Sequence, residues 1–444
     1  MLRINNIKMP INHNDGDLKK SVIKMLGISE SQLKSFEITG QAIDARNKNN
    51  IIYVYAVDIE LDDEEKYKDF PNVREIEKAE YIVEKMELGN RKRPVVVGSG
   101  PSGLFAALVL AEAGLKPIIL EQGKNVDERQ KDVYSFFKNG KFNKYSNVQF
   151  GEGGAGTFSD GKLTTNTNNF RMQKIYSELI LAGAEKRIAY MSKPHVGTDK
   201  LIGIMKNIRK KIESLGGEYR FQNKLISIEY ENNKISKAIV EIISDDDSER
   251  EKEIYEIEAD VIVLAIGHSS RETFYMLNDK DVKMERKTFS VGVRIEHKQS
   301  MINRSQYGKF ADRLPAAEYK LNAKAKNGRG VYTFCMCPGG VVVPAASEEG
   351  RLVVNGMSYS GRNLENANLV NVYPEDFGEG GVLAGVEFQR KLEEKAFELG
   401  GSDYKAPVQL FGDFVKNVKS EKLGKVKPSY AKGYRFANLN ECFP

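Results

Sequence analysis

A glycine-rich turn, Gly98-Ser99-Gly100-Pro101-Ser102-Gly103, is the part of the sequence best suited to binding phosphate groups. Its glycines have the spacing of a dinucleotide fold, where one makes the tight turn, one lets the backbone approach a pyrophosphate, and one lets helix and strand pack closely. The helix that follows would direct unpaired N–H groups at the phosphates. Glu121 comes about 20 residues later, where an acid accepts hydrogen bonds from ribose hydroxyls. The pattern predicts FAD or NAD rather than NADP, because the ribose is expected to carry no phosphate.

A second glycine-rich segment covers 147–163 and has five glycines in seventeen residues. A backbone pressed against a flat aromatic ring needs positions without a Cβ. Thr157, Ser159, Asp160 and Lys162 can supply hydrogen bonds to the pyrimidine edge of a flavin. Lys162 can also stabilise negative charge on the reduced ring. A glycine-rich turn without a ligand is the alternative interpretation.

The choice between FAD and NAD depends on the rest of the chain. A further strand and turn, Asp260–Gly267, closes far downstream of the first unit, as in flavoproteins whose sheet is interrupted by an excursion. We therefore predict FAD, with NAD(P)H as a transient electron donor because only one dinucleotide loop is visible. The expected cofactor-binding residues are Gly98, Gly100, Pro101, Ser102, Gly103, Glu121, Gln122, Arg129, Gly153, Gly154, Ala155, Gly156, Thr157, Ser159, Asp160, Gly161, Lys162, Leu225, Ala265 and Gly267.

His195 and Lys162 are the candidate catalytic residues. His195 precedes Thr198, an expected N-cap, and a histidine at a helix start can act as a general acid or base. A capping or packing role is the alternative. His268 is expected to line the cofactor cleft and His297 to contact substrate or simply end a strand. The four histidines of the chain include no pair at ligand spacing, so we predict no metal site.

Cys335 and Cys337 form a Cys-x-Cys pair whose side chains share one face of a strand. A dithiol beside a flavin can pass electrons to a disulfide. A bridge at this spacing is strained, however, and the better-attested redox spacing is Cys-x-x-Cys. We therefore favour buried or pocket-lining cysteines over a redox pair.

Apolar runs predict the elements that position these residues. A strand at 94–97, a helix at 104–113 and a strand at 117–120 form a β-α-β unit, which implies a parallel sheet. Apolar residues at helical spacing predict a helix over 201–215, closed by Gly216-Gly217. Further strands are expected at 225–230, 235–243, 261–266, 290–296, 331–335, 341–343 and 352–354, with a polar hairpin tip at 245–253.

The N-terminal part reads as a separate β-α-β-β unit, followed by a helix-like stretch near Ile76–Leu88. The expected class is α/β: a Rossmann-like FAD-binding parallel sheet with an inserted β-rich domain and a small N-terminal α+β domain. The expected domains are 1–90 (N-terminal), 91–286 (FAD-binding), 287–427 (inserted, substrate-covering) and 428–444 (return towards the FAD-binding domain).

Composition narrows the setting of the protein. The 444 residues have a net charge of only +5, which does not argue for nucleic acid. No run approaches the ~18 apolar residues of a membrane-spanning helix, and the N-terminus lacks a signal peptide. Three cysteines cannot form a disulfide framework, so we expect a cytoplasmic protein. We also expect a small-molecule substrate and no membrane partner. Lys416, Lys419, Lys422, Lys425 and Lys427 form a basic stretch that we interpret as a solvated loop.

Seven segments make the chain resemble a family of FAD-dependent oxidoreductases or dehydrogenases of unknown substrate. This family is distantly similar to the glutathione-reductase-like flavoproteins. The resemblance runs over the whole chain and implies FAD and an oxidoreductase activity, but no substrate. The segments that carry it are Val97–Gly103, Glu121, Asn147–Leu163, Ser192–Asp199, Ala265–Ser269, Val293–His297 and Phe334–Gly340.

We therefore expect an FAD-dependent oxidoreductase that transfers a hydride through the flavin. Such flavoproteins normally end with a further strand, loop and helix under the flavin, and the sequence stops at Pro444 without them. This leads us to expect a truncated chain or an incomplete flavin site with weak affinity for FAD. A non-catalytic flavin- or nucleotide-binding redox protein is one alternative. An RNA-modifying flavoenzyme is another, against which the lack of a concentrated basic face counts.

Overall fold

The computed structural model describes residues 1–78, 80–159, 161–163, 165, 167, 169–244, 252–333, 336–359 and 366–443, with backbone alone for 15, 366–371 and 374. The chain forms two compact units. The first joins Met1–Ile82, Lys162–Val196 and Lys298–Tyr319, and the second contains the remaining residues. The four domain ranges expected from the sequence stay predictions, because the units reflect spatial contact rather than continuous stretches of chain.

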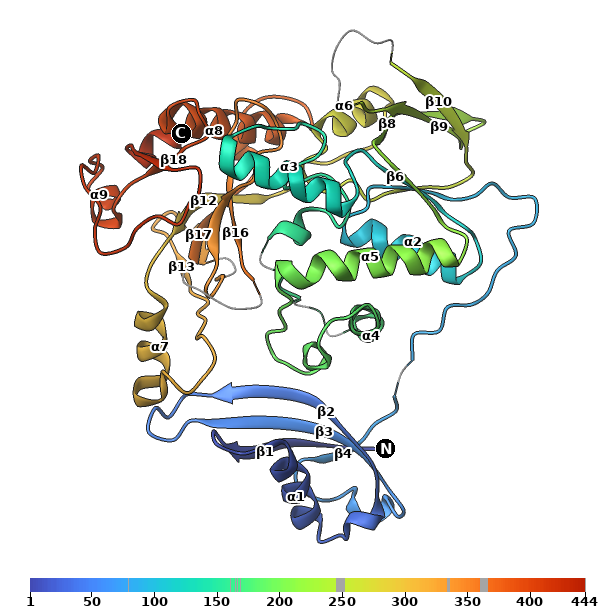
Figure 1. Ribbon diagram of the computed structural model, residues 1–444, viewed down its shortest axis with the longest axis vertical. Coiled ribbons are helices and arrows are strands. Elements are labelled where there is room, and N and C mark those ends of the chain that lie inside the picture. The colour runs from blue at the N-terminus through green and yellow to red at the C-terminus, as the bar shows by residue number, and fades with distance from the viewer. Residues whose placement is uncertain are drawn as a thin grey trace. The chain divides into compact units, whose positions relative to one another are not determined.

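The first unit is built on an antiparallel sheet covered by one helix, the expected β-α-β-β order (Figure 1). The strands lie in the order β2-β3-β1-β4, and their apolar side chains are buried with those of α1. Edge strand β2 pairs with a later segment, because Gln41 exchanges backbone hydrogen bonds with Tyr190 and Ser192. The elements are β1 (Leu2–Pro10), α1 (Asp15–Leu26), β2 (Leu33–Asp44), β3 (Ile52–Leu61), β4 (Val73–Glu75), α4 (Arg171–Leu181) and α7 (Gln299–Tyr307).

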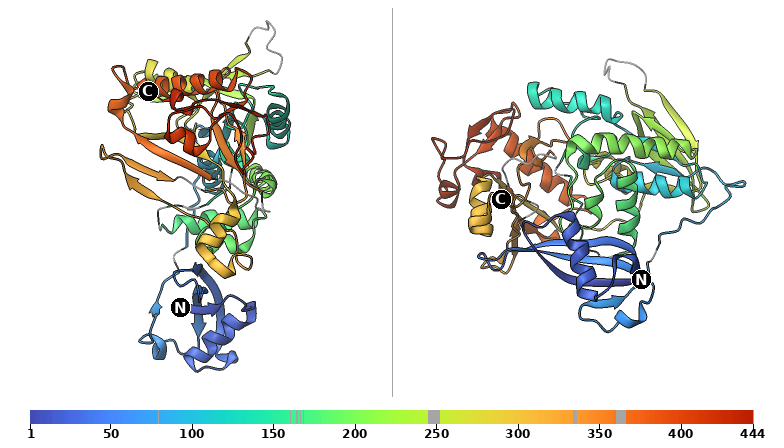
Figure 2. Two further views of the ribbon diagram at one scale, coloured as in Figure 1. Left: turned by 90° about the vertical axis from the view of Figure 1, so that its left-hand side faces the viewer. Right: turned by 60° about the horizontal axis from the view of Figure 1, so that its bottom comes forward.

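The second unit contains the predicted parallel sheet, in the order β11-β5-β6-β7. The three valines of β5 are buried, and α2 and α5 pack against each other and against the sheet (Figures 1 and 2). An antiparallel sheet, β10-β9-β8, follows it, and the tip at 245–251 lies outside the described residues. The elements are β5 (Val95–Val97), α2 (Pro101–Glu112), β6 (Ile118–Glu121), α3 (Val126–Asn139), α5 (Thr198–Ser214), β7 (Glu218–Phe221), β8 (Asn223–Glu231), β9 (Lys234–Ile242), β10 (Ile254–Glu258), β11 (Ile262–Leu264) and α6 (Arg271–Asp279).

The strand-rich part forms a four-stranded antiparallel sheet, β12-β17-β14-β13, and a hairpin, β15-β16. Several strand boundaries differ from expectation by a few residues; β16, for example, begins at Val354 and not at Leu352. The expected end of the strand at 331–335 stays a prediction, because 334 and 335 lie outside the described residues. The elements are β12 (Phe289–Ile295), β13 (Asn322–Lys324), β14 (Gly330–Thr333), β15 (Val341–Pro344), β16 (Val354–Met357), β17 (Asn366–Val372), α8 (Ala384–Gly400), β18 (Ala406–Val408), α9 (Phe411–Val415) and β19 (Tyr434–Phe436). The predicted α/β class is confirmed.

The helix expected near Ile76–Leu88 is wrong, because the described residues of this stretch are irregular. Its backbone bonds to other segments: the Ile76 N–H donates to the Met1 carbonyl and the Met86 N–H to that of Ala113. Ile82 is 77% exposed and Met86 47%, so these apolar side chains do not form a buried helical face. A short helix is marginal without such burial, and helical spacing alone did not suffice.

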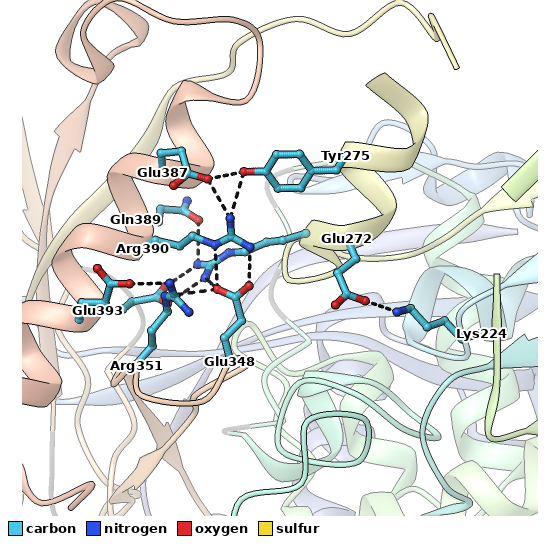
Figure 3. A network of polar contacts seen from close by, with 11 residues as sticks. Lys224, Glu272, Tyr275, Glu348, Arg351, Glu387, Gln389, Arg390 and Glu393 are labelled. Atoms are coloured by element: carbon cyan, nitrogen blue, oxygen red, sulfur yellow. Dashed lines mark hydrogen bonds and ion pairs between the residues drawn. The ribbon is translucent and has the colours of Figure 1, made fainter. Parts of the chain in front are cut away.

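A network of charged side chains attaches α6 to α8 (Figure 3). Arg271, at the start of α6, is 5% exposed and donates to Glu348 and, at 2.6 and 3.0 Å, to Glu393 of α8. Arg390 donates to the same Glu348 carboxylate at 2.6 and 3.0 Å. Burial alone would raise the pKa of Glu348, but its hydrogen bonds to Arg390 and Arg271 lower that pKa to about 2.

We expect Arg271→Ala to lower the thermal unfolding midpoint by several degrees at pH 7. The variant leaves two partly buried carboxylates without this cation, a defect that costs about 3–5 kcal/mol in buried pairs. Because the folded-state pKa of Glu348 lies below 4.5, its contribution is present above pH 4.5 and is lost as pH falls towards 2. The difference from wild type should therefore shrink in acid.

Arg46→Ala is the matched control, because this arginine pairs with Asp44 while its side chain is 91% exposed. Exposed pairs contribute about 0–1 kcal/mol. Calorimetry at pH 7 and pH 3 compares the two variants, and equal effects would contradict a structural role for the network.

Candidate dinucleotide site

The carboxyl ends of β5, β6 and β11 surround a cavity of about 420 Å³ in the second unit. This is the edge at which parallel sheets bind nucleotides. His268 lines the cavity, as expected, and its Nδ1 lies 2.7 Å from the Ser269 hydroxyl. Burial and then the Arg271 charge lower the pKa of the His268 imidazole. The predicted residues that line the cavity are Gly98, Gly100, Pro101, Ser102, Glu121, Gln122, Gly154, Ala155, Gly156, Leu225, Ala265 and Gly267.

The glycines of the first loop serve different purposes. Gly98 has φ +96°, and a Cβ there would lie 2.5 Å from the Ala265 carbonyl oxygen. A Cβ at Gly103 would lie 1.9 Å from the Gly98 oxygen, so helix and strand approach too closely for any side chain. Gly100 has an ordinary extended backbone, and its Cβ would meet nothing nearer than Gly154 Cα at 3.7 Å. Protein packing therefore does not require glycine at position 100, whereas a ligand close to the backbone would.

Helix α2 begins beside the cavity with its N-terminal groups available. The N-cap is Gly100, which has no side chain to bond the first N–H groups of the helix, and Pro101 occupies the first helical position. The first turn therefore presents backbone N–H groups and a partial positive charge, an arrangement that binds phosphate.

The buried carboxylate of Glu121 already accepts four hydrogen bonds from the protein. One oxygen accepts from the N–H and hydroxyl of Ser99 at 2.9 and 2.8 Å, and the other from the N–H groups of Gly123 and Gly151 at 2.9 and 3.0 Å. Each carboxylate oxygen has about two acceptor positions, so all are in use. A ribose hydroxyl would have to replace one donor, and the Ser99 hydroxyl is the one that can rotate away. Glu121 lines the cavity, and its contact with a ribose stays a prediction; its spacing in the sequence gives no sign of the hydrogen bonds from Ser99.

The second glycine-rich segment lies directly against the first loop. Gly153 donates its N–H to the Ser99 carbonyl at 2.9 Å, and a Cβ at Gly154 would lie 2.8 Å from Gly100 Cα. The lack of side chains thus lets two backbones meet at the cavity. Contact of this backbone with the flat ring of a flavin, which the glycines predict, stays a prediction.

Arg129, which we expected to contact the cofactor, does not line the cavity. Its guanidinium is fully buried and donates to the carbonyl oxygens of four residues in the second glycine-rich segment, at 2.7 to 3.2 Å. It also lies over the Phe158 ring, 4.9 Å from the centroid. Burial lowers the pKa of Arg129 to about 10, so it stays charged at neutral pH. Arg129 therefore fixes the backbone of the second glycine-rich segment.

The other predicted residues lie outside the lining of the cavity, and Asp160 lies outside the described residues. Gly103 and Gly153 support the loops from behind, Thr157 is buried, and Gly161 has φ +60°. Lys162 and His195 belong to the first unit, where an antiparallel backbone bridge pairs them. The structure thus brings these two candidates together, in the unit that does not contain the cavity.

The prediction that Thr198 is the N-cap of α5 is wrong, because Gly197 occupies that position. The Thr198 hydroxyl instead donates to the Ser159 carbonyl at 2.8 Å. It therefore fixes the start of α5 to the second glycine-rich segment. A hydroxyl next to a helix start fits both roles, and only the position of Ser159 decides between them.

Sequence reasoning missed a polar cluster of Ser159, Asn355 of β16 and Arg294 of β12. Asn355 donates to the Ser159 hydroxyl at 3.2 Å and accepts from Arg294 at 3.4 Å. Among the described residues, Arg294 forms no ion pair, and its buried Nε has no hydrogen-bond partner. Cys337 is buried, as favoured above, and lies at the same place, since a Cβ at Gly356 would be 2.7 Å from its Sγ and 2.6 Å from Arg294 Nη1. Cys335 lies outside the described residues.

In the part of the chain that the structure describes, no three side chains of the histidine, cysteine, aspartate and glutamate kinds gather as metal ligands. Likewise, no helix in that part of the chain has the length and apolar character needed to cross a membrane.

We expect Gly100→Val to fold normally and to lose FAD binding, because its side chain would enter space needed by the pyrophosphate and no protein atom obstructs the Cβ. Gly103→Val is the contrasting variant, since its Cβ would overlap the Gly98 carbonyl and should prevent stable folding. Circular dichroism melting and titration with FAD check both. A Gly100→Val protein that retains one FAD per chain would show that the phosphate lies elsewhere.

Two flavoproteins are among the solved structures that match parts of this chain. The flavin-dependent brominase Bmp2 is 13% identical with a TM-score of 0.33, over 64% of this chain and 57% of that one. A flavoprotein/dehydrogenase from Cytophaga hutchinsonii is 13% identical with a TM-score of 0.31, over 66% of this chain and 58% of that one. The chain thus spans less than two thirds of either structure.

Sequence comparison identifies the family. Residues 93–130 match an FAD binding domain, residues 288–444 a family described as FAD-dependent protein, C-terminal domain-like, and residues 1–60 a domain of unknown function. An uncharacterized protein of Clostridium beijerinckii is 48% identical over 457 residues, which cover 100% of this chain and 83% of that protein. Identity of this level over the whole chain is found between members of one family. This protein therefore belongs to the family of FAD-dependent oxidoreductases whose substrate is unknown.

Proposed function

We propose that this protein is an FAD-dependent dehydrogenase in which a hydride passes between a small organic substrate and the flavin. One observation supports it above the others: the uncapped N-terminus of α2 opens, beside Glu121, into a cavity that both glycine-rich segments line. The open space at Gly100 and the free N–H groups fit a pyrophosphate. When bound, the flavin supplies an acceptor for two electrons as hydride.

The residues divide into two groups by what they would bind. The first turn of α2 would hold the pyrophosphate, and Glu121 the ribose once the Ser99 hydroxyl turns away. Leu225, Ala265 and Gly267 line the same cavity and would surround the remaining nucleotide part. Because the loops are already fixed by hydrogen bonds, binding would require little reordering, which favours affinity.

Residues around Ser159 would act at the flavin ring, where the redox reaction takes place. Ser159 connects the second glycine-rich segment to Asn355, which in turn bonds Arg294. A partly buried guanidinium without a carboxylate partner in the described chain is suited to stabilising negative charge that develops during reaction. Lys162 and His195 belong to the first unit, and their roles in charge stabilisation and proton transfer stay predictions from the sequence. The sequence has one dinucleotide loop, so NADH or NADPH would bind transiently.

Anaerobic titration tests the proposal directly. We expect the purified protein to bind FAD and NADH or NADPH to bleach the flavin absorbance, with reoxidation by an added acceptor. Gly100→Val, which should not hold FAD, controls for reduction of free flavin. Bound FAD that neither nucleotide nor a panel of small alcohols, amines and hydroxy acids reduces would favour the alternative, a non-catalytic flavin-binding protein.

A pair of variants tests the ribose contact. Glu121→Ala should weaken FAD binding roughly ten- to a hundredfold, as expected for a lost hydrogen bond to a charged group of ~1.5–3 kcal/mol. It should also reduce stability, because three backbone N–H groups lose their acceptor. Ser99→Ala frees one acceptor position on Glu121 and should leave FAD affinity equal or higher.

Isothermal titration of apoprotein measures both affinities, and denaturation of the apoproteins measures stability separately. If Ser99→Ala weakens FAD as much as Glu121→Ala, the carboxylate does not accept from the ribose and acts only on the protein.

A further inference from the structure

An exposed apolar surface occurs on the segment 410–427, which contains α9 and the loop that follows it. Figure 1 shows this segment at the edge of the C-terminal, red part of the chain. Phe411 and Val415 are each 67% exposed, Val418 is 48% exposed and Leu410 36%. Single exposed apolar residues are ordinary, but a group on one short segment marks an interaction surface.

Polar groups on the inner side of the segment fix its shape. Ser420 is 2% exposed, and its hydroxyl accepts from the Leu410 N–H at 2.8 Å and donates to Asp413 at 2.6 Å. Gln409 donates to the Val418 carbonyl at 2.7 Å, and Asn440 to the Phe414 carbonyl at 2.9 Å. These bonds hold the backbone of the segment with Ser420 inside, while Phe411 and Val415 lie at the surface.

The same segment has an excess of positive charge. Its five lysines and two acids, Asp413 and Glu421, give a net charge of +3. In the described part of the chain, none of these lysines takes part in an ion pair, and all are exposed. The lysines are Lys416, Lys419, Lys422, Lys425 and Lys427.

We propose that the segment 410–427 binds the surface of a membrane that contains anionic lipids. Phe411, Val415 and Val418 would enter the boundary between headgroups and acyl chains, while the lysines contact lipid phosphates and carboxylates. Such a surface contact needs no spanning helix. RNA fits less well, because bases stack on aromatic rings and the outward side chains are mostly aliphatic. Binding of a membrane by this segment requires neither the flavin nor the proposed activity.

The sequence offers a direct probe, since it contains no tryptophan. Phe411→Trp therefore gives a single reporter at the centre of the proposed contact. Its emission should shift to shorter wavelength with vesicles of phosphatidylcholine and phosphatidylserine, and not with phosphatidylcholine alone. Sedimentation of the wild-type full chain with the same vesicles should give the same order, and added salt should weaken binding.

Matched variants separate the two contributions. Lys416→Gln with Lys419→Gln should reduce vesicle affinity about fivefold for each lysine removed. Phe411→Ser with Val415→Ser should reduce it roughly tenfold or more, through lost apolar burial. Lys280→Gln with Lys283→Gln, and Ile254→Ser, alter exposed residues elsewhere and should leave vesicle binding unchanged.

Three outcomes would overturn the proposal. Emission that does not shift with anionic vesicles excludes insertion of residue 411. Equal losses in the controls show a general charge effect. A dimer in analytical ultracentrifugation, or an RNA mobility shift, that Phe411→Ser with Val415→Ser abolishes while vesicle binding is absent would assign the surface to another copy or to RNA.

Discussion

The arrangement of the candidate dinucleotide site depends on one buried carboxylate. Glu121 accepts hydrogen bonds from the first glycine loop, from the turn after its own strand and from the second glycine-rich segment. An ionised carboxylate is costly to bury unless donors surround it, and here every acceptor position has one. Because the donors come from three separate segments, satisfying the charge also fixes the positions of those segments. The cavity exists where they meet.

Two further buried charges, one of each sign, hold the second glycine-rich segment in place. Arg129 donates to four carbonyl groups, and Glu152, fully buried, accepts from the Val126 N–H and from Arg209 of α5. The two glycine-rich segments have few side chains to pack, so hydrogen bonds between charges and backbone replace apolar contacts there. Satisfied networks of this kind are rigid, which suits loops that must approach a ligand closely. The family membership and the architecture of the site are thus consistent.

Polar groups also decide the form of the strand-rich half. Arg271 and Arg390 converge on Glu348, which attaches α6, whose start borders the cavity, to α8. In the segment 410–427, Ser420 and Asp413 occupy the inside and leave Phe411 facing water. In both places internal hydrogen bonds fix the backbone, and this determines which side chains remain at the surface.

The sequence by itself determined the elements whose signals are local. Strand β5, the glycine turn, α2 and Glu121 are specified within about 25 residues by an apolar run, glycine spacing and one acid, and the structure forms them as expected. The N-terminal β-α-β-β order follows likewise from alternation and helical spacing. Tertiary structure alone decided that Arg129 faces the backbone and not the cavity, that Thr198 bonds Ser159 instead of capping a helix, that 76–88 is irregular, and that Arg294 meets Asn355. The sequence gives the types of residues and their spacing along the chain. The partner of a charge or a hydroxyl depends on groups from distant segments, because these come within hydrogen-bond reach only in the folded chain.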